Sequence, residues 1–305
     1  METINADSED RGTRLDIWLN RHMPDMSRNR IQSLIKGGHV RISGQLKKPH
    51  YLLLGSESVE IERPDPQPAA IIPEALPLNI LHEDEAVIVL NKPPGLVIHP
   101  SPGHATGTLV NALLHRYPEL SLHDDDTRPG IVHRLDKDTT GVMIVARSAE
   151  SAEHLVNQFK TRAVHKEYLA IVQGHIEPES GEVETLVGRS PGNRKKMSAH
   201  PEHGRQAVTR YETVERFKDA SLVRMTIETG RTHQIRVHMT YLGHPVYGDR
   251  TYGKAGRKDA AIAVDRQMLH SERLSLTHPI TLEPIEFRAP MPDDMRELIQ
   301  GMREK

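Results

Sequence analysis

The sequence predicts an α+β protein with two domains, a small basic one and a larger one in which strands dominate. A chain of 305 residues exceeds the usual length of a single domain, and 36% hydrophobic residues suffice for packed cores. Five prolines fall in one short stretch, at positions 64, 66, 68, 73 and 77, where neither a regular helix nor a central strand can form. From residue 79 onward, short apolar runs of strand length recur between turn signals.

These features divide the chain into four segments. Residues 1–12 are expected to form a flexible N-terminus, and residues 13–62 a small folded module of two helices and a hairpin. Residues 63–78 are the proline-rich linker, which we expect to be a semi-extended spacer. Residues 79–305 are expected to form the larger domain.

The small module is predicted from helical spacing that gives way to alternation. Apolar side chains in residues 14–19 share one helical face. Ser27 is expected to cap a second helix, whose apolar positions fall in residues 31–35. Residues 39–42 alternate like a strand, and a second extended run reaches residues 59–61. The predicted order is therefore helix, helix, hairpin.

The net charge of −2 hides two opposite blocks. Residues 11–50 hold nine Lys and Arg against two acids, whereas residues 51–90 hold one base against eight acids. A basic block of this kind is typical of a module that binds a polyanion, and the alternative is a solvated face that binds nothing. The basic side chains that could follow a phosphate backbone are Arg14, Arg28, Arg30, Lys36 and Arg41.

The larger domain is predicted from apolar strands and capped helices. Continuous apolar runs predict strands at residues 86–90, 142–146, 168–172 and 222–227. Helices are predicted over residues 109–117 with Thr108 as the cap, from a Ser148 cap to Phe159, and over residues 292–303. The domain is therefore expected to be rich in sheet.

Several classes of site and location are excluded or disfavoured. The chain has no cysteine, which excludes disulfides, thiolate zinc sites, iron–sulfur clusters and cysteine nucleophiles. It has no glycine-rich nucleotide loop and no HExxH motif, and we expect neither a cofactor nor a metal. No stretch approaches 18 apolar residues and the N-terminus carries no secretory signal, so we expect a cytoplasmic protein. Candidate metal ligands are better interpreted as surface or structural histidines: His99, His104, His133, His233 and His238.

One dense polar segment stands out between two apolar runs, residues 130–141, with the sequence GIVHRLDKDTTG. So many charged and hydroxyl side chains are poor core material, and loops on rigid scaffolds often carry function. The alternative is a surface turn rich in turn-forming residues. A glycosidase is disfavoured because its two carboxyls must lie about 5 Å or more apart on opposite sides of a bond. Asp136 and Asp138 are only two residues apart in one loop.

This segment resembles the HRLD-x-[DE]-T-[ST]-G signature of the RluA-type pseudouridine synthases. Further motifs of that family are matched, in order, by residues 91–100, 166–170, 229–239 and 243–249. The resemblance covers about residues 79–295. Residues 13–61 resemble an S4-like RNA-binding domain, through the pattern RLD-x-W-L followed by SR-x-x-I-Q-x-L-I-K-x-G. The order of the two domains also matches the family.

The resemblance implies a fold and a reaction. The larger domain is expected to be a pseudouridine synthase domain on a bent, mostly antiparallel mixed β-sheet with a central RNA-binding cleft. Such an enzyme is an isomerase that breaks the N1–C1′ bond of a uridine and rejoins the base through C5. No cofactor or metal is implied. A carboxylate can attack C1′ or C6, and a glycal route that begins at C2′ is a further possibility.

The resemblance also implies roles for individual residues. Asp136 matches the catalytic aspartate, Arg236 the arginine that pairs with it, and Tyr168 the tyrosine that packs against the target base and can relay a proton. Arg134 matches the residue that replaces the flipped base in the RNA stack. Lys92 and Arg231 are expected to line the same cleft, and residues 189–196 are either a phosphate contact or a solvated loop.

The expected substrate is large-subunit (23S) ribosomal RNA, either free or within a pre-ribosomal particle, and the expected state is a monomer. This expectation follows from the resemblance, because family members with this module and length act mainly on that RNA. A transfer RNA pseudouridine synthase is the nearest alternative. A non-catalytic ribosome-assembly protein would need the S4-like module but not Asp136, and a methyltransferase would need a glycine-rich cofactor loop that the sequence lacks.

Overall fold

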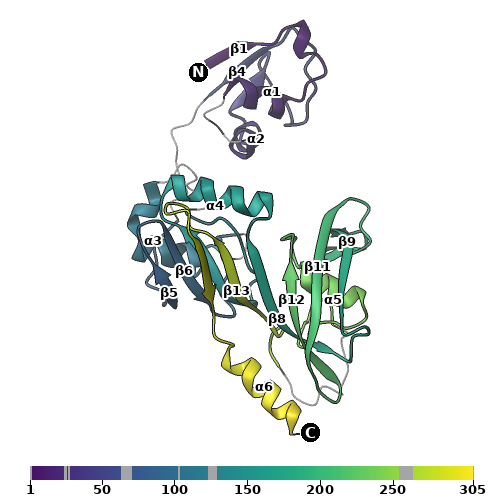
Figure 1. The fold of residues 1–305 in the computed structure, drawn as a ribbon. Helices are drawn as coiled ribbons and strands as arrows, with labels where there is room; N and C mark the ends of the chain where they lie inside the picture. The colour runs from purple at the N-terminus through teal and green to yellow at the C-terminus, as the bar shows by residue number, and fades with distance from the viewer. Residues whose placement is uncertain are drawn as a thin grey trace. The chain divides into compact units, whose positions relative to one another are not determined.

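A computed structural model describes residues 2–23, 26, 28–62, 71–101, 104–122, 129–253 and 264–304. The chain forms two compact units, Met1–Ala70 and Ile71–Lys305 (Figure 1). In the described part of the chain, no helix combines the length and the apolar character needed to cross a membrane.

The N-terminal unit packs two helices on a small sheet. Its helices are α1 (Leu15–His22) and α2 (Arg28–Lys36), as the helical spacing predicts. Four strands pair in the order β1-β4-β2-β3, with bounds β1 Glu2–Asn5, β2 Val40–Ile42, β3 Gln45–Leu46 and β4 Ser58–Ile61. The apolar faces of both helices and of β2 and β4 bury one core around Trp18, which is fully buried. The expected helices and hairpin are therefore confirmed.

The expectation of a flexible N-terminus over residues 1–12 is wrong. Strand β1 pairs antiparallel with β4, from Glu2 opposite Ile61 to Asn5 opposite Ser58. A short 3₁₀-helix (Ser8–Asp10) follows, in which the Asp7 carboxylate accepts the N–H of Glu9. Backbone pairing and a side-chain cap satisfy these polar groups locally, so the segment is ordered without a hydrophobic run. Ser27, the expected cap of α2, lies outside the described residues.

The second half of the expected linker belongs to the larger unit. Ile71 and Leu78 pack against its main core. The side-chain amide of Asn111 donates to the backbone carbonyl of Ile72 at 2.7 Å. The backbone carbonyl of Asn111 accepts the N–H of Glu74 at 3.0 Å. These bonds replace the strand ladder that the prolines prevent. Residues 63–70 lie outside the described residues.

The larger unit contains a ten-stranded sheet. The strand order is β10-β9-β11-β12-β8-β13-β7-β6-β5, and β14 also pairs with β13. Its bounds are β5 Ile80–Glu83, β6 Val87–Lys92, β7 Thr140–Ala146, β8 His165–Gln173, β9 Ser180–Ser190, β10 Asn193–Ser198, β11 Gly204–Arg216, β12 Ala220–Ile227, β13 Leu269–Thr277 and β14 Pro284–Arg288. Only β13 and β7 pair in parallel among the described strands; the other pairs are antiparallel. The expected mostly antiparallel mixed sheet is confirmed.

Helices cover both faces of the sheet near β6 and β7. The helix α3 (Leu109–Arg116) shares a core with Met143 and Val145, whereas α4 (Ala149–Thr161) shares a core with Val142 and Ile144. Successive strand residues point to opposite faces, so β7 must be apolar throughout when both faces are covered. This explains the continuous apolar runs in the sequence.

The predicted helices of the larger unit are confirmed, and one further helix is present. Thr108 and Ser148 cap α3 and α4 through their side chains, and α6 spans Asp293–Arg303. The additional helix α5 (Gln234–Tyr241) packs against β9 and β11 (Figure 1). It carries most of the predicted arginine motif and therefore positions the candidate site.

Candidate active site

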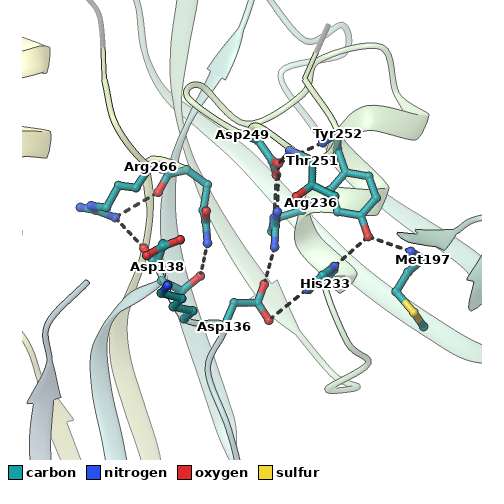
Figure 2. Close-up of polar contacts among 12 residues, drawn as sticks. Asp136, Asp138, Met197, His233, Arg236, Asp249, Thr251, Tyr252 and Arg266 are labelled. Carbon is teal, nitrogen blue, oxygen red and sulfur yellow. Dashed lines mark hydrogen bonds and ion pairs between the residues drawn. The ribbon is translucent and has the colours of Figure 1, made fainter. Parts of the chain in front are cut away.

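Asp136 and Arg236 meet although they lie 100 residues apart in the sequence. Asp136 precedes β7, in a loop closed by a hydrogen bond from the Thr139 N–H to the Asp136 carbonyl. The Nη1 of Arg236 donates to Oδ2 of Asp136 at 3.0 Å (Figure 2). The carboxylate side chain is 18% exposed and the guanidinium side chain only 6%. The predicted pairing of these two residues is therefore present, at the edge of solvent.

Asp249 fixes the orientation of Arg236. Its Oδ2 accepts a hydrogen bond from Nε of Arg236 at 2.6 Å, and its Oδ1 accepts one from Nη2 at 2.9 Å (Figure 2). Oδ1 also accepts hydrogen bonds from the backbone N–H groups of Thr251 and Tyr252. Burial opposes charge on both partners. The hydrogen bonds and opposite charges outweigh burial, so the pKa of Asp249 is lowered and that of Arg236 is raised. The charged guanidinium of Arg236 is therefore held with its remaining nitrogen, Nη1, directed at Asp136.

His233 and Tyr252 form a second line of contacts to the same carboxylate. The Nε2 of His233 lies 3.8 Å from Oδ1 of Asp136, and its Nδ1 lies 2.8 Å from the Tyr252 hydroxyl. That hydroxyl accepts the N–H of Met197 at 2.9 Å (Figure 2). Burial, followed by the charge of Arg236, lowers the pKa of His233 despite the opposing charge of Asp136. A neutral imidazole therefore stands beside Asp136.

Tyr168 lies on β8 and is almost fully buried, at 7% exposure. It lies opposite Ser271 of β13 in the strand register. Burial, together with the nearby charge of Asp136, raises the pKa of Tyr168 to about 12. The phenol therefore keeps its proton at neutral pH.

Four of these side chains, those of Asp136, Arg236, His233 and Tyr168, line one pocket. It is lined by the loop before β7, by β8, by the end of β12 with the start of α5, and by β13. The residues are Arg134, Leu135, Asp136, Thr139, Tyr168, Ile227, Gly230, Arg231, Thr232, His233, Gln234, Ile235, Arg236 and Leu269. Five of the predicted site residues are among them, and Arg134 is exposed. The fold thus brings distant motifs to a single open pocket.

The prediction that Lys92 lines the RNA cleft is wrong. Lys92 ends β6 and is fully buried. Its Nζ donates to the carbonyls of Lys137 at 2.7 Å and Pro93 at 2.9 Å. Burial lowers the pKa of Lys92 to about 7, and the charges of Asp138 and Asp136 only partly offset that effect. A fully buried amine cannot reach an RNA phosphate, so Lys92 instead holds the loop that carries Asp136.

Arg266 holds the next carbonyl of the same loop. Its Nη1 donates to the carbonyl of Asp138 at 3.2 Å (Figure 2). Its Nε and Nη2 donate to both oxygens of Asp294 on α6, at 2.6 and 2.7 Å. Two basic side chains, Lys92 and Arg266, therefore donate to consecutive backbone carbonyls just after Asp136. No sequence motif indicated a role for Arg266, whereas Asp249 ends the matched motif of residues 243–249, which was the available signal.

Two of the predicted basic residues of the N-terminal unit contact one buried acid. Arg14 and Arg28 both bind the Asp16 carboxylate, at 3.0 and 2.8 Å, while their own side chains stay 42% and 47% exposed. Gln32 also donates to this carboxylate. The side chains of Lys36 and Arg41 are exposed, whereas the side chain of Arg30 lies outside the described residues.

Two of the candidate histidine ligands have structural contacts. His133 accepts the N–H of Ile144 at 3.0 Å, and burial lowers its pKa to about 3. His238 lies between the hydroxyls of Thr185 and Thr209, and burial lowers its pKa to about 4. Among the residues that the structure describes, no three His, Asp or Glu side chains gather as a metal site would require.

Comparison with known proteins agrees with this arrangement. Residues 86–241 match the RNA pseudouridylate synthase family, and residues 13–59 match the S4 domain. The chain is 43% identical to the ribosomal large subunit pseudouridine synthase D of Escherichia coli O157:H7, over 99% of this chain and 94% of that one. It is 42% identical to the uncharacterized RNA pseudouridine synthase YlyB of Bacillus subtilis, over 98% and 97%. The human RNA pseudouridylate synthase domain containing 4 has a similar structure, with a TM-score of 0.59 and 28% identity, covering 74% of this chain and 93% of its own.

The pocket, its ordered motifs and the similarity over nearly the whole chain lead to one assignment. The family is matched over more than half of the chain, and the N-terminal unit supplies the RNA-binding module. This protein therefore belongs to the RNA pseudouridylate synthase family, whose members are isomerases acting on RNA.

Proposed function

We propose that this protein isomerises specific uridines of large-subunit ribosomal RNA and that Asp136 is its catalytic residue. The observation that carries the proposal is the ion pair between Asp136 and Arg236, at the wall of an open pocket that Tyr168 also lines. The fixed cation orients this carboxylate while the carboxylate remains accessible to substrate.

The reaction rearranges one nucleotide without an external group. The N1–C1′ bond of uridine breaks, the base turns, a C5–C1′ bond forms, and the proton leaves C5 while N1 gains one. The Asp136 carboxylate can serve as the nucleophile at C1′ or C6, or as the base at C2′. All three routes require an anionic oxygen that faces the flipped nucleotide, and Oδ1 of Asp136 makes only the 3.8 Å contact with His233 among the contacts given above.

Tyr168 and Arg134 have complementary roles in this proposal. Tyr168 forms a wall for the base, and its raised pKa of about 12 keeps the phenol protonated at neutral pH, so that it can donate a hydrogen bond but cannot act as a base. Arg134 is exposed at the pocket. A uridine inside a helix must leave the stack to reach Asp136, and the planar guanidinium of Arg134 can occupy the gap.

The proposed substrate rests on the relatives and on the N-terminal unit. Relatives at 42–43% identity over nearly full length are named ribosomal large subunit pseudouridine synthase D. The exposed Lys36 and Arg41, with Arg14 and Arg28, give the S4 domain a basic surface that can bind the RNA backbone. We propose that the enzyme acts as a monomer in the cytoplasm, on free RNA or on a pre-ribosomal particle. Transfer RNA is the alternative substrate.

Pseudouridine mapping tests the proposal. Unmodified ribosomal RNA and transfer RNA are incubated with the wild type and with Asp136→Asn, without added metal or cofactor. We expect new pseudouridine in large-subunit RNA with the wild type only. Asp136→Asn should bind this RNA with nearly unchanged affinity, because the substitution preserves size.

Each other outcome has a defined meaning. Pseudouridine in transfer RNA alone would show that the proposed substrate is wrong and that the proposed reaction is right. If neither RNA is modified although both bind tightly, pre-ribosomal particles are the next substrate to test. Failure on particles as well would favour a non-catalytic assembly protein and would overturn the proposal.

A further inference from the structure

Two arginines other than Arg236 donate hydrogen bonds to the same residue, Gln206 of β11. The Nη2 of Arg162 donates to the side-chain carbonyl of Gln206 at 3.3 Å. The Nε of Arg231 donates to its backbone carbonyl at 3.0 Å. Arg162 ends α4 in a left-handed conformation with φ of 63°, and Arg231 lies in the turn between β12 and α5. Distant segments thus place two guanidinium groups at one point.

This cluster carries uncompensated positive charge. Arg205 adjoins Gln206, and no ion pair with a carboxylate is present for Arg162, Arg205 or Arg231 within the described residues. Burial, and then the charges of Arg205 and Arg162, lower the pKa of Arg231. The nearest acid in the network is Glu184, which accepts the side-chain N–H of Gln206. Like charges held together in this way favour binding of an anion.

A neighbouring arginine on the same strand shows the contrast. Arg210 is exposed, but its guanidinium pairs with Glu182 at 2.8 Å and with Glu228 at 2.6 Å. Its charge is therefore neutralised by two carboxylates. The uncompensated charge on β11 is confined to the end of the strand near Gln206.

Arg231 links this cluster to the pocket, since it lines the same wall as Asp136. Resting on the proposed function, we propose that Arg162 and Arg231, held by Gln206, bind one phosphodiester of the RNA backbone beside the flipped uridine. Each guanidinium uses one N–H group for Gln206 and keeps others for phosphate oxygens. Arginine forks match the geometry of phosphate oxygens, and such contacts position the nucleotide without reading its base.

The test measures RNA affinity against salt in the Asp136→Asn background, so that no turnover occurs. The variants are Arg162→Gln, Arg231→Gln and the double substitution, with unmodified large-subunit ribosomal RNA as the probe. Loss of one phosphate contact should lower the slope of log affinity against log salt by about 0.7–0.9. Because the two arginines share one phosphate, the double variant should lose about as much slope as one single variant.

Arg210→Gln is the matched control, because it removes an exposed arginine from the same strand. It should leave the affinity and the slope unchanged. In the active enzyme, Arg162→Gln should raise KM by about tenfold, as expected for a lost charge-assisted contact of about 1.4 kcal/mol, with little change in kcat. A double variant with the affinity and slope of the Arg210→Gln variant would overturn the phosphate site.

Failure of this inference is distinguishable from failure of the proposed function. If the wild type makes pseudouridine and the double variant binds normally, only the phosphate site is wrong. If the wild type makes no pseudouridine on any RNA but the double variant loses affinity and slope, the phosphate site stands and the catalytic proposal falls.

Discussion

Asp249 accepts two hydrogen bonds from Arg236, at 2.6 and 2.9 Å, and these bonds fix the direction of the third guanidinium nitrogen. That nitrogen is the one that reaches Asp136. The Asp249 side chain is fully buried and the Arg236 side chain nearly so. The orientation of the Asp136 carboxylate therefore depends on a residue that does not line the pocket.

Asp249→Asn should therefore impair turnover more than RNA binding. The amide keeps the shape but removes the charge and one acceptor, which leaves Arg236 only partly satisfied. Loss of a hydrogen bond to a charged group, about 1.5–3 kcal/mol, predicts a single-turnover rate lower by about 10- to 150-fold. Breaking a buried ion pair should also lower the free energy of unfolding by about 3–5 kcal/mol.

Single-turnover kinetics at saturating RNA and thermal unfolding measure the two effects. Glu182→Gln is a suitable control, because it removes an acid from an exposed ion pair with Arg210. The control should behave as the wild type. A normal rate for Asp249→Asn would mean that Arg236 finds its orientation without this partner.

Local signals in the sequence predicted the regular elements well. Thr108 and Ser148 cap their helices as expected, and the apolar run of β7 is buried throughout. The sequence did not predict helix α5, for a physical reason. Its residues QIRVHMTY include three β-branched side chains, and its N-cap residue, His233, provides no side-chain cap. Packing against β9 and β11 stabilises this helix, and no local pattern encodes that packing.

The candidate site likewise contains residues that the sequence predicted and residues that it did not. The residues named from motifs, Asp136, Tyr168 and Arg236, lie at one pocket. Two supporting residues, Lys92 and Arg266, were misjudged or missed because their roles depend on backbone carbonyls. In the sequence, Lys92 is indistinguishable from a surface lysine. In the fold it is buried, and its Nζ donates to the backbone carbonyl of Lys137.

A second prediction concerns the C-terminal helix. Asp294→Asn should weaken the hydrogen bonds that orient Arg266, which donates to the carbonyl of Asp138 near Asp136, the proposed catalytic residue. We expect about tenfold slower single turnover, equivalent to about 1.4 kcal/mol, with unchanged RNA affinity. The matched control is Asp293→Asn, because Asp293 begins the same helix but pairs only with the exposed Arg296 among its described contacts. Equal effects of the two substitutions would refute a specific role for Arg266.

A third prediction concerns pH and Lys92. The pKa of this amine falls from 10.5 to about 7 on folding. Between these values the unfolded chain binds more protons than the folded chain, so stability rises with pH, by up to about 1.4 kcal/mol per pH unit. Lys92→Met should lack this rise. Urea unfolding followed by circular dichroism from about pH 7 to 10 compares the two proteins, and parallel curves would contradict the assignment.

The last prediction separates two roles of the basic residues in the S4 domain. Arg28 is exposed enough to bind RNA, but it also neutralises the buried Asp16. Arg41 is exposed and contacts only the Gly44 carbonyl, at 3.5 Å, among its described contacts. Both Arg28→Gln and Arg41→Gln should reduce the salt slope of RNA binding by about 0.7–0.9, the value of one phosphate contact. Only Arg28→Gln should destabilise the domain.

Acid unfolding distinguishes them, and the sign follows from Asp16. Burial would raise its pKa, but Arg14, Arg28 and Gln32 outweigh burial and lower it. The stabilisation is therefore present above the ordinary carboxyl pKa and is lost as the pH falls. Arg28→Gln removes part of that shift, so the domain should unfold at a higher pH. Trp18 is the single tryptophan of the chain and is fully buried in this unit, so its fluorescence reports this transition alone. Equal acid midpoints for Arg28→Gln and Arg41→Gln would show that Arg14 and Gln32 suffice to hold Asp16.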